Sequence, residues 1–285
     1  MRAVTGPGRW VWGLSGLVTA AALAVPGVRL IDSGGLAQHV TPAPDAVTRM
    51  VTVPQPVDSL TVQSYGAPVR VMTGSTSRVQ VTETLWYDHQ DGGPPTVTPL
   101  VSGGRLTLAA PACASADCSV GFAVTVPPGV TVTVASQGGP VTVSGTDGAN
   151  LDSDGGPVSV TRIGGPLTVG TGGGPLHVNG LAGALRADTA GGDVVARGVA
   201  AATATVSTGG GQALIDFSAA PDTVTVSTDG GPAQLTVPGG PYALTADSGD
   251  GPESAGIAVD PAASRSITVF SGGGPLRIEP PARLW

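Results

Sequence analysis

Apolar and polar residues alternate along most of the chain after about residue 57. Apolar pairs two positions apart, such as Val132 with Val134 and Val224 with Val226, recur beside short glycine-rich stretches. A period of two residues is typical of a strand that buries one face. Helices are disfavoured because 45 Gly and 26 Pro interrupt the sequence every few residues. The pattern therefore predicts an all-β protein.

The glycine-rich stretches form an internal repeat. Each copy reads Ser or Thr, any residue, a pair that is nearly always Gly-Gly, usually Pro, and then alternating apolar residues. The Ser/Thr column is Ser136, Ser153, Thr171, Thr189, Thr208, Thr228, Ser248 and Ser271. The glycine column three residues later is Gly139, Gly156, Gly174, Gly192, Gly211, Gly231, Gly251 and Gly274. Two columns that persist through eight copies predict one structural unit, repeated.

A strand, a glycine corner and a second strand cannot bury their apolar face alone, whereas stacked copies share one core. The repeat therefore predicts a single-stack β-solenoid, or β-helix, of about eight coils. The glycine column is expected at corners that need a positive φ or a close backbone approach. The Ser/Thr column is expected to form a hydroxyl ladder to neighbouring coils or corner amides. The alternative is an antiparallel β-sandwich in which each copy is a hairpin.

The repeat divides the chain into four segments. Residues 130–285 are the predicted β-solenoid, and 57–129 an irregular β region that caps it and begins with a degenerate copy at Ser64. Residues 32–56 are expected to form a Pro-rich linker, although a short strand over 47–53 is an alternative. Pro280 and Pro281 are expected to end the stack.

Residues 1–31 are predicted to be a membrane helix or a signal segment. Trp10–Val28 carries no charge, and Arg2 and Arg9 precede it. Its length is close to that needed to cross a bilayer, and the arginines favour a cytoplasmic amino terminus. Cleavage after Ala24 is the alternative. The first reading predicts a single-pass cell-membrane protein with its C-terminal domain extracytoplasmic, and the second a secreted protein.

Charge narrows the choice of partners. Beyond residue 31 the chain has 10 Arg, no Lys and 20 Asp or Glu, a net charge of about −10. A nucleic-acid partner is excluded because phosphates require a basic face. Membrane contact through the first segment, and envelope polymers or surface proteins, remain as expected partners.

Few residues suggest chemistry. Cys113 and Cys118 are expected to form a disulfide across a short loop. His39, His89 and His177 are scattered, so no metal or other cofactor is expected. Asp152 and Asp188 share a column two coils apart, which places them ~9.6 Å apart. That distance lies near the upper limit of the separation between the two catalytic carboxyl groups of inverting glycosidases. No third catalytic group accompanies Asp152 and Asp188, so no catalytic residues and no enzyme activity are expected.

The layout resembles the DUF4097 family. An amino-terminal apolar segment, the start Gly66-Ala67-Pro68-Val69, the step Val126–Val130 and the repeated Ser/Thr-x-Gly-Gly-Pro corners carry the resemblance over about residues 57–279. It implies a β-strand-repeat protein described as a putative adhesin of the bacterial envelope. The lack of Lys and the abundance of Ala, Gly and Val resemble an actinobacterial member.

These features together predict an envelope-anchored, extracellular interaction surface without catalysis. Two alternatives stay open: a polysaccharide-active enzyme on a β-helix, and an envelope-stress or scaffold component.

Overall fold

The computed structural model describes residues 45–87, 93–111 and 118–282. Contacts divide the chain into two units, 1–42 and 43–285, and all described residues belong to the second. The predicted membrane or signal segment, residues 1–31, lies outside the described residues. No helix with the length and hydropathy to cross a bilayer occurs in the part of the chain that is described.

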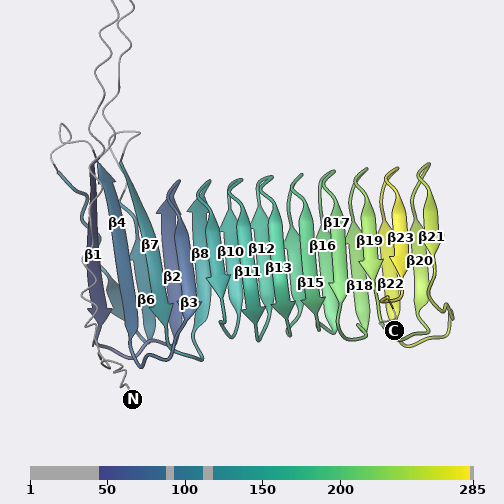
Figure 1. Cartoon of the computed structure of the whole chain (residues 1–285), viewed down its shortest axis with the longest axis horizontal. Coiled ribbons are helices and arrows are strands. Elements are labelled where there is room, and N and C mark those ends of the chain that lie inside the picture. Colours follow the sequence, from purple (N-terminus) through teal and green to yellow (C-terminus); the bar gives the residue numbers. More distant parts are fainter. Residues whose placement is uncertain (1–44, 88–92, 112–117, 283–285) are drawn as a thin grey trace, which may run out of the picture. The chain divides into compact units, whose positions relative to one another are not determined.

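The described chain is all β, with two mostly parallel sheets (Figure 1). Sheet A has twelve strands in the spatial order β1 (Asp45–Val53), β4 (Val79–Tyr87), β7 (Ser119–Val126), β3 (Val69–Thr73), β9 (Val141–Ser144), β11 (Val158–Ile163), β13 (Leu176–Leu181), β15 (Val194–Val199), β17 (Ala213–Phe217), β19 (Ala233–Thr236), β23 (Leu276–Glu279) and β21 (Glu253–Ala255). Sheet B has eleven strands in the order β20 (Ala243–Asp247), β22 (Ser266–Phe270), β18 (Thr223–Ser227), β16 (Thr203–Ser207), β14 (Leu185–Asp188), β12 (Leu167–Thr171), β10 (Ala149–Ser153), β8 (Thr131–Gln137), β2 (Ser59–Tyr65), β6 (Arg105–Ala109) and β5 (Leu100–Ser102).

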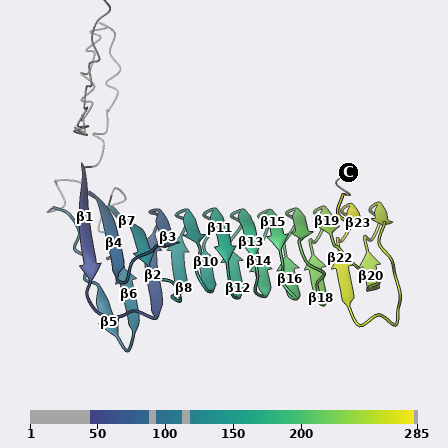
Figure 2. The ribbon, with the colours of Figure 1, turned by 60° about the horizontal axis from the view of Figure 1, so that its bottom comes forward.

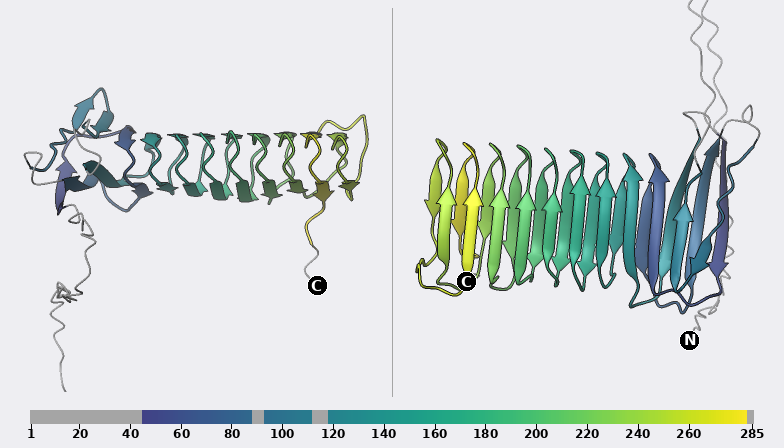
Figure 3. Two further views of the ribbon diagram at one scale, coloured as in Figure 1. Left: turned by 90° about the horizontal axis from the view of Figure 1, so that it is seen from above. Right: turned by 180° about the vertical axis from the view of Figure 1, so that it is seen from behind.

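The chain alternates between the two sheets at each corner. β8 lies in sheet B, β9 in sheet A and β10 in sheet B again, where it pairs parallel with β8. Figures 2 and 3 show this alternation repeated from β8 to β19, with the two sheets facing each other. A hairpin would pair β8 with β9 antiparallel in one sheet, so the sandwich alternative does not describe these strands. The arrangement is consistent with a β-helix-like fold.

One continuous apolar core fills the space between the sheets. Alternate side chains of each strand point inward, and nearly all of them are Val, Leu, Ile or Ala with little exposure to solvent. In β8, for example, Val132 and Val134 are 2% and 1% exposed, while Thr131 and Thr133, which alternate with them, are exposed. Burial of this kind of surface stabilises a protein by about 25 cal/mol per Å². Since each coil covers the next, stability depends on the stack and not on any single coil.

The glycine column lies where successive corners touch. A Cβ built on Gly174 would lie 2.3 Å from the carbonyl oxygen of Gly156, and one on Gly156 would lie 2.3 Å from that of Gly139. The column therefore needs glycine because the backbone of the next coil occupies the space. The positive φ belongs to the preceding glycine instead, such as Gly173 at 118°, and positive φ favours glycine for a different reason.

The hydroxyl of each residue in the Ser/Thr column is turned inward and donates to its own corner. In all eight copies the acceptor is the carbonyl oxygen of the glycine three residues later, as from Ser136 to Gly139 at 3.0 Å and from Thr171 to Gly174 at 2.6 Å. Ser64 donates to Ala67 in the same way at 3.1 Å. The shared acceptor is therefore a carbonyl within the same copy, whereas the sequence suggested a neighbouring coil or a corner amide; Thr228 also reaches the carbonyl oxygen of Ser271 in the neighbouring coil, at 3.5 Å. The hydrogen bond satisfies an acceptor in a buried bend.

The region before the regular coils extends both sheets. β2 and β3 form a complete coil around Ser64, and β4, β6 and β7 lie beyond it. Part of the predicted linker, residues 45–53, is the strand β1, which pairs antiparallel with β4. The reason lies in the alternation Val47, Val51, Val53, whose side chains pack against the core.

The last two coils exchange places in the stack. β22 lies between β18 and β20, and β23 lies between β19 and β21, so the final coil in sequence is the penultimate coil in space. Figure 1 shows the yellow strands β22 and β23 inside the outermost coil. The expectation that Pro280 and Pro281 end the stack is therefore wrong, because the coil of β20 and β21 ends it.

Apolarity explains this order. The final coil buries Ile267, Val269, Leu276 and Ile278, each at most 2% exposed. In the outer coil the residue that pairs with Leu276 is Glu253, which is exposed. A carboxylate in the inward column is costly between two coils and acceptable at the end, where an inward-pointing charge also discourages further strand pairing.

Candidate functional site

The outer face of sheet B carries a row of hydroxyl groups. One outward position on ten neighbouring strands is linked by the pairing register, and eight of the ten are threonine. In spatial order the row is Thr107, Thr61, Thr133, Asn150, Thr168, Arg186, Thr205, Thr225, Thr268 and Thr245. None of these side chains is buried. The row therefore presents hydrogen-bonding groups at a regular step of ~4.8 Å, the spacing of neighbouring strands.

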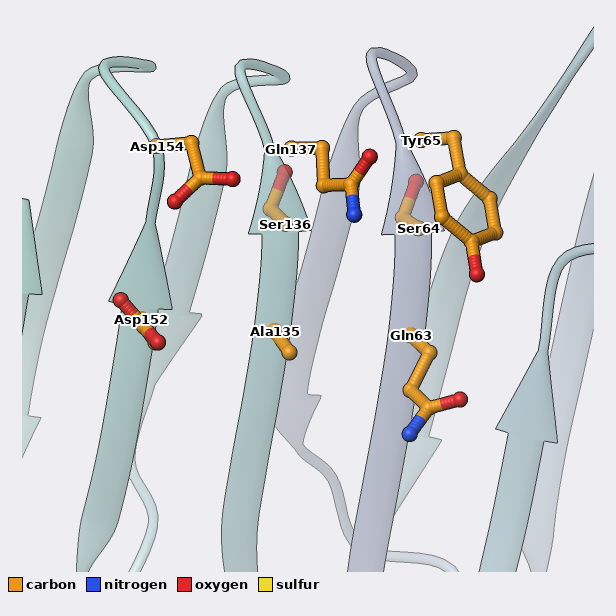
Figure 4. A pocket seen from close by; sticks show the side chains of 8 residues that line it. All are labelled: Gln63, Ser64, Tyr65, Ala135, Ser136, Gln137, Asp152 and Asp154. Atoms are coloured by element: carbon orange, nitrogen blue, oxygen red, sulfur yellow. The ribbon is translucent and has the colours of Figure 1, made fainter. Parts of the chain in front are cut away.

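A hollow of about 240 Å³ opens on this face beside the row. Gln63 and Tyr65 of β2 line it from one side, Ala135 and Gln137 of β8 from the centre, and Asp152 of β10 with the corner residue Asp154 from the other (Figure 4). The pairing of β2, β8 and β10 aligns Gln63, Ala135 and Asp152 side by side. The hollow exists because Ala135 is short while its neighbours are long.

The hollow combines several recognition groups. Tyr65, which is 44% exposed, supplies an aromatic ring with a hydroxyl. Gln63 and Gln137 supply amides that both donate and accept, and Asp152 and Asp154 supply carboxylates that accept. No basic side chain is among the described residues that line it. These groups can bind a ligand that is rich in hydroxyl donors. They are unsuited to binding an anion.

A second hollow of about 340 Å³ lies further back along the same strands. Thr131 and Thr133 of β8, Asn150 of β10 and Thr168 of β12 line it, together with the backbone around Gly148. Both hollows share β8 and β10. Along β8 the outward side chains are Thr131, Thr133, Ala135 and Gln137, so a floor of mainly small residues connects the two.

The residues singled out from sequence do not form a catalytic cluster in the described part of the chain. Asp152 and Asp188 lie in one row with Gly170 between them, and both point outward. His177 lies on the outer face of sheet A, while His39 and His89 lie outside the described residues. Across the described ranges, no group of three His, Cys, Asp or Glu side chains is placed to hold a metal ion.

The corner glycines and the Ser/Thr hydroxyls have a structural role, since they face the core or the next corner. The predicted disulfide includes Cys113, which lies outside the described residues, so this pairing stays a prediction.

Sequence reasoning missed Gln63, Tyr65, Ala135 and Gln137. Residues 63 and 135 are far apart in sequence, and the strands β4 to β7 intervene between the coils that bring them together. A signal existed, because these residues flank Ser64 and Ser136 in the same columns of the repeat. It could be read only by assuming that the degenerate copy at Ser64 stacks directly on the copy at Ser136.

Glu83 is a charged residue within the core. It lies on β4, is 2% exposed, and its Oε1 has no hydrogen-bond partner among the described residues. Burial raises the pKa of Glu83 above its ordinary value of 4.5, and Arg49, opposite it on β1, lowers the pKa to a lesser degree. Glu83 is therefore a cost to folding whenever it is ionised.

We expect Glu83→Gln to stabilise the protein at pH 8 by about 1–3 kcal/mol, because the amide has the shape of the carboxylate without its buried charge. A carboxyl whose pKa is raised by folding stabilises the protein below its unfolded pKa and loses that contribution as pH rises through the folded value. The difference between variant and wild type should therefore vanish near pH 4. Urea unfolding at both pH values measures it, with the exposed Glu253→Gln as control. A gain of the same size at both pH values would contradict the assignment.

Comparison with known proteins gives distant structural relatives. No protein-family model matches the chain, and no curated protein matches its sequence. A putative cell adhesion protein from Clostridium sporogenes is 10% identical, over 83% of this chain and 100% of that chain, with a TM-score of 0.27. A putative adhesin from Parabacteroides distasonis is 13% identical, over 82% of this chain and 97% of that chain, with a TM-score of 0.43.

A putative lipid binding protein from Parabacteroides distasonis is 10% identical, over 82% of this chain and 96% of that chain, with a TM-score of 0.43. With identities this low and TM-scores below 0.5, no residue correspondence and no ligand are carried over. The resemblance to the DUF4097 family and the actinobacterial source stay predictions.

Proposed function

We propose that this chain is a membrane-anchored β-solenoid that acts outside the cytoplasm as an adhesin-like binding surface, without catalysis. The observation that carries the proposal is the outward face of sheet B, where eight threonines line one row of ten positions. A stacked scaffold holds these groups rigidly, which lowers the entropy cost of binding an extended partner. The apolar segment Trp10–Val28 supplies the anchor in this proposal.

The acidic balance of the chain favours partners that are not strongly anionic. Neutral envelope polysaccharides and surface proteins meet that condition. Two alternatives have less support. A polysaccharide-active enzyme would use Asp152 and Asp188 as its carboxylates, and no particular residue favours an envelope-stress or scaffold component.

The proposal is tested with spheroplasts of bacteria that produce the full chain. We expect them to adhere to immobilised cell-envelope polysaccharide, and the double variant Thr205→Lys with Thr225→Lys to adhere about tenfold less, because it places two bulky charges in the threonine row. The matched control is Ser159→Lys, an exposed residue of β11 on the outer face of sheet A.

Two results would count against the proposal. Adhesion that appears only after lysis would overturn the extracytoplasmic location. Adhesion that is absent, or equally affected by changes on both faces, would overturn the assignment of the binding surface to sheet B.

A further inference from the structure

We propose that the hollow over Ala135 binds a sugar ring of a neutral, hydroxyl-rich oligosaccharide that lies along β8. This inference rests on the proposed function and names the ligand class for one part of its binding surface. It starts from a short side chain between two longer ones: Ala135 lies between Gln63 and Asp152, and the resulting space is about 240 Å³. That volume is below the ~300–1,000 Å³ of pockets that enclose drug-sized ligands, so it suits a single ring.

The groups around this space match the two kinds of surface that a sugar presents. An aromatic ring has an apolar face and, in tyrosine, a polar end, so Tyr65 can pack against the C–H face of a sugar and still contact its hydroxyls. Asp152 and Asp154 accept hydrogen bonds from hydroxyl donors, and the amides of Gln63 and Gln137 both donate and accept. Each hydroxyl of a sugar is also both donor and acceptor.

Charge excludes the main competing ligands. Two carboxylates line the hollow, and no basic side chain among the described residues lines it. An anionic polymer, such as a phosphate-linked or uronic-acid chain, would be repelled without compensation. A divalent cation is not favoured either, since Asp152 and Asp154 have no third His, Cys, Asp or Glu beside them among the described residues.

The second hollow extends the binding surface beyond one sugar ring, so we infer that the ligand is an oligosaccharide and not a monosaccharide. It lies along the same strands, at Thr133 and Asn150. From Thr131 to Gln137 the outward face of β8 extends about 20 Å, as six steps of ~3.3 Å. β2 and β10 flank this floor at Ala135, and the second hollow continues from β8 over β10 toward β12, so a linear chain can place one ring over Ala135 and its neighbours over Thr133 and Asn150.

The test uses the purified full chain in detergent, titrated by calorimetry with a neutral tetrasaccharide of β-1,4-linked N-acetylglucosamine. We expect saturable binding that weakens at least about tenfold, or 1.4 kcal/mol, in Ala135→Phe, which fills the hollow. Tyr65→Ala should weaken it by a similar factor. A tetrasaccharide of galacturonic acid, which is anionic, should bind at least about tenfold less tightly than the neutral one.

The matched control is Ala190→Phe, an exposed alanine at the corner after β14 on the same side of the stack. Equal binding by Ala135→Phe and Ala190→Phe would overturn the site, and so would equal binding of the anionic tetrasaccharide. Melting curves of each variant establish that the fold persists, as expected for exposed positions. If no tetrasaccharide binds while spheroplast adhesion still depends on Thr205 and Thr225, the sugar site is wrong and the proposed function stands.

Discussion

Replacing Gly174 with alanine should destabilise the protein by more than about 4 kcal/mol, a loss seen only for severe core defects. The added Cβ would lie 2.3 Å from the carbonyl oxygen of Gly156 and 2.6 Å from that of Gly155. Both atoms belong to the backbone of the adjacent coil, so no side-chain rotation relieves the clash. Denaturant unfolding of the variant and wild type measures the loss.

Two nearby glycines provide graded controls. Gly173 has open space around its Cβ position but a φ of 118°, so alanine there should cost only the strain of an unfavourable backbone, about 1–3 kcal/mol. Gly164 has neither a positive φ nor any heavy atom nearer than 3.9 Å, so alanine should be neutral or stabilise by up to about 1 kcal/mol. Equal losses at Gly173 and Gly174 would show that the contact between corners is not what the column requires.

Deleting residues 261–285 should expose the whole outer coil to solvent exchange. Among the described strands, β20 pairs only with β22 and β21 only with β23, so the deletion removes every described strand partner of the outer coil. Hydrogen exchange followed by mass spectrometry should show protection lost across residues 243–260.

Retained protection of those residues would contradict the exchanged order of the last two coils. If the coils stacked in chain order, β20 would pair with β18, and the deletion would remove only a terminal coil. Amides of β10, which has partners on both sides in β8 and β12, should stay protected in either case and serve as the internal control.

The repeat columns carry most of the information about the fold. Aligning the Ser/Thr column predicts that Ser136, Ser153 and Thr171 are lateral neighbours, and the strand register pairs them in this way. The columns cannot give the order of the last two coils, because the copies at Ser248 and Ser271 satisfy the same motif. Only the flanks distinguish them: one has Glu253 where the other has Leu276, a difference in apolarity that decides which coil can be covered.

The candidate site was much less accessible from sequence. Its hollow depends on a short residue between long ones on three adjacent strands, and the strand that carries Gln63 and Tyr65 is separated from β8 by the strands β3 to β7. Asp152 could be found because it belongs to a regular copy. Ala135 and Gln137 belong to the regular copy at Ser136 as well, but Gln63 and Tyr65 belong to the degenerate copy at Ser64, so the hollow could be found only by stacking that copy directly on the copy at Ser136.

The exchanged coils also bear on how the chain folds during synthesis. Each coil up to β19 can dock on one already made, so the stack can grow in the order in which residues emerge. β20 and β21 break this sequence, because their partners β22 and β23 are made later. The coil of β20 and β21 therefore has to wait until β22 and β23 have docked on β18 and β19, and until then β18 and β19 present an uncovered edge that is open to mispairing with another chain.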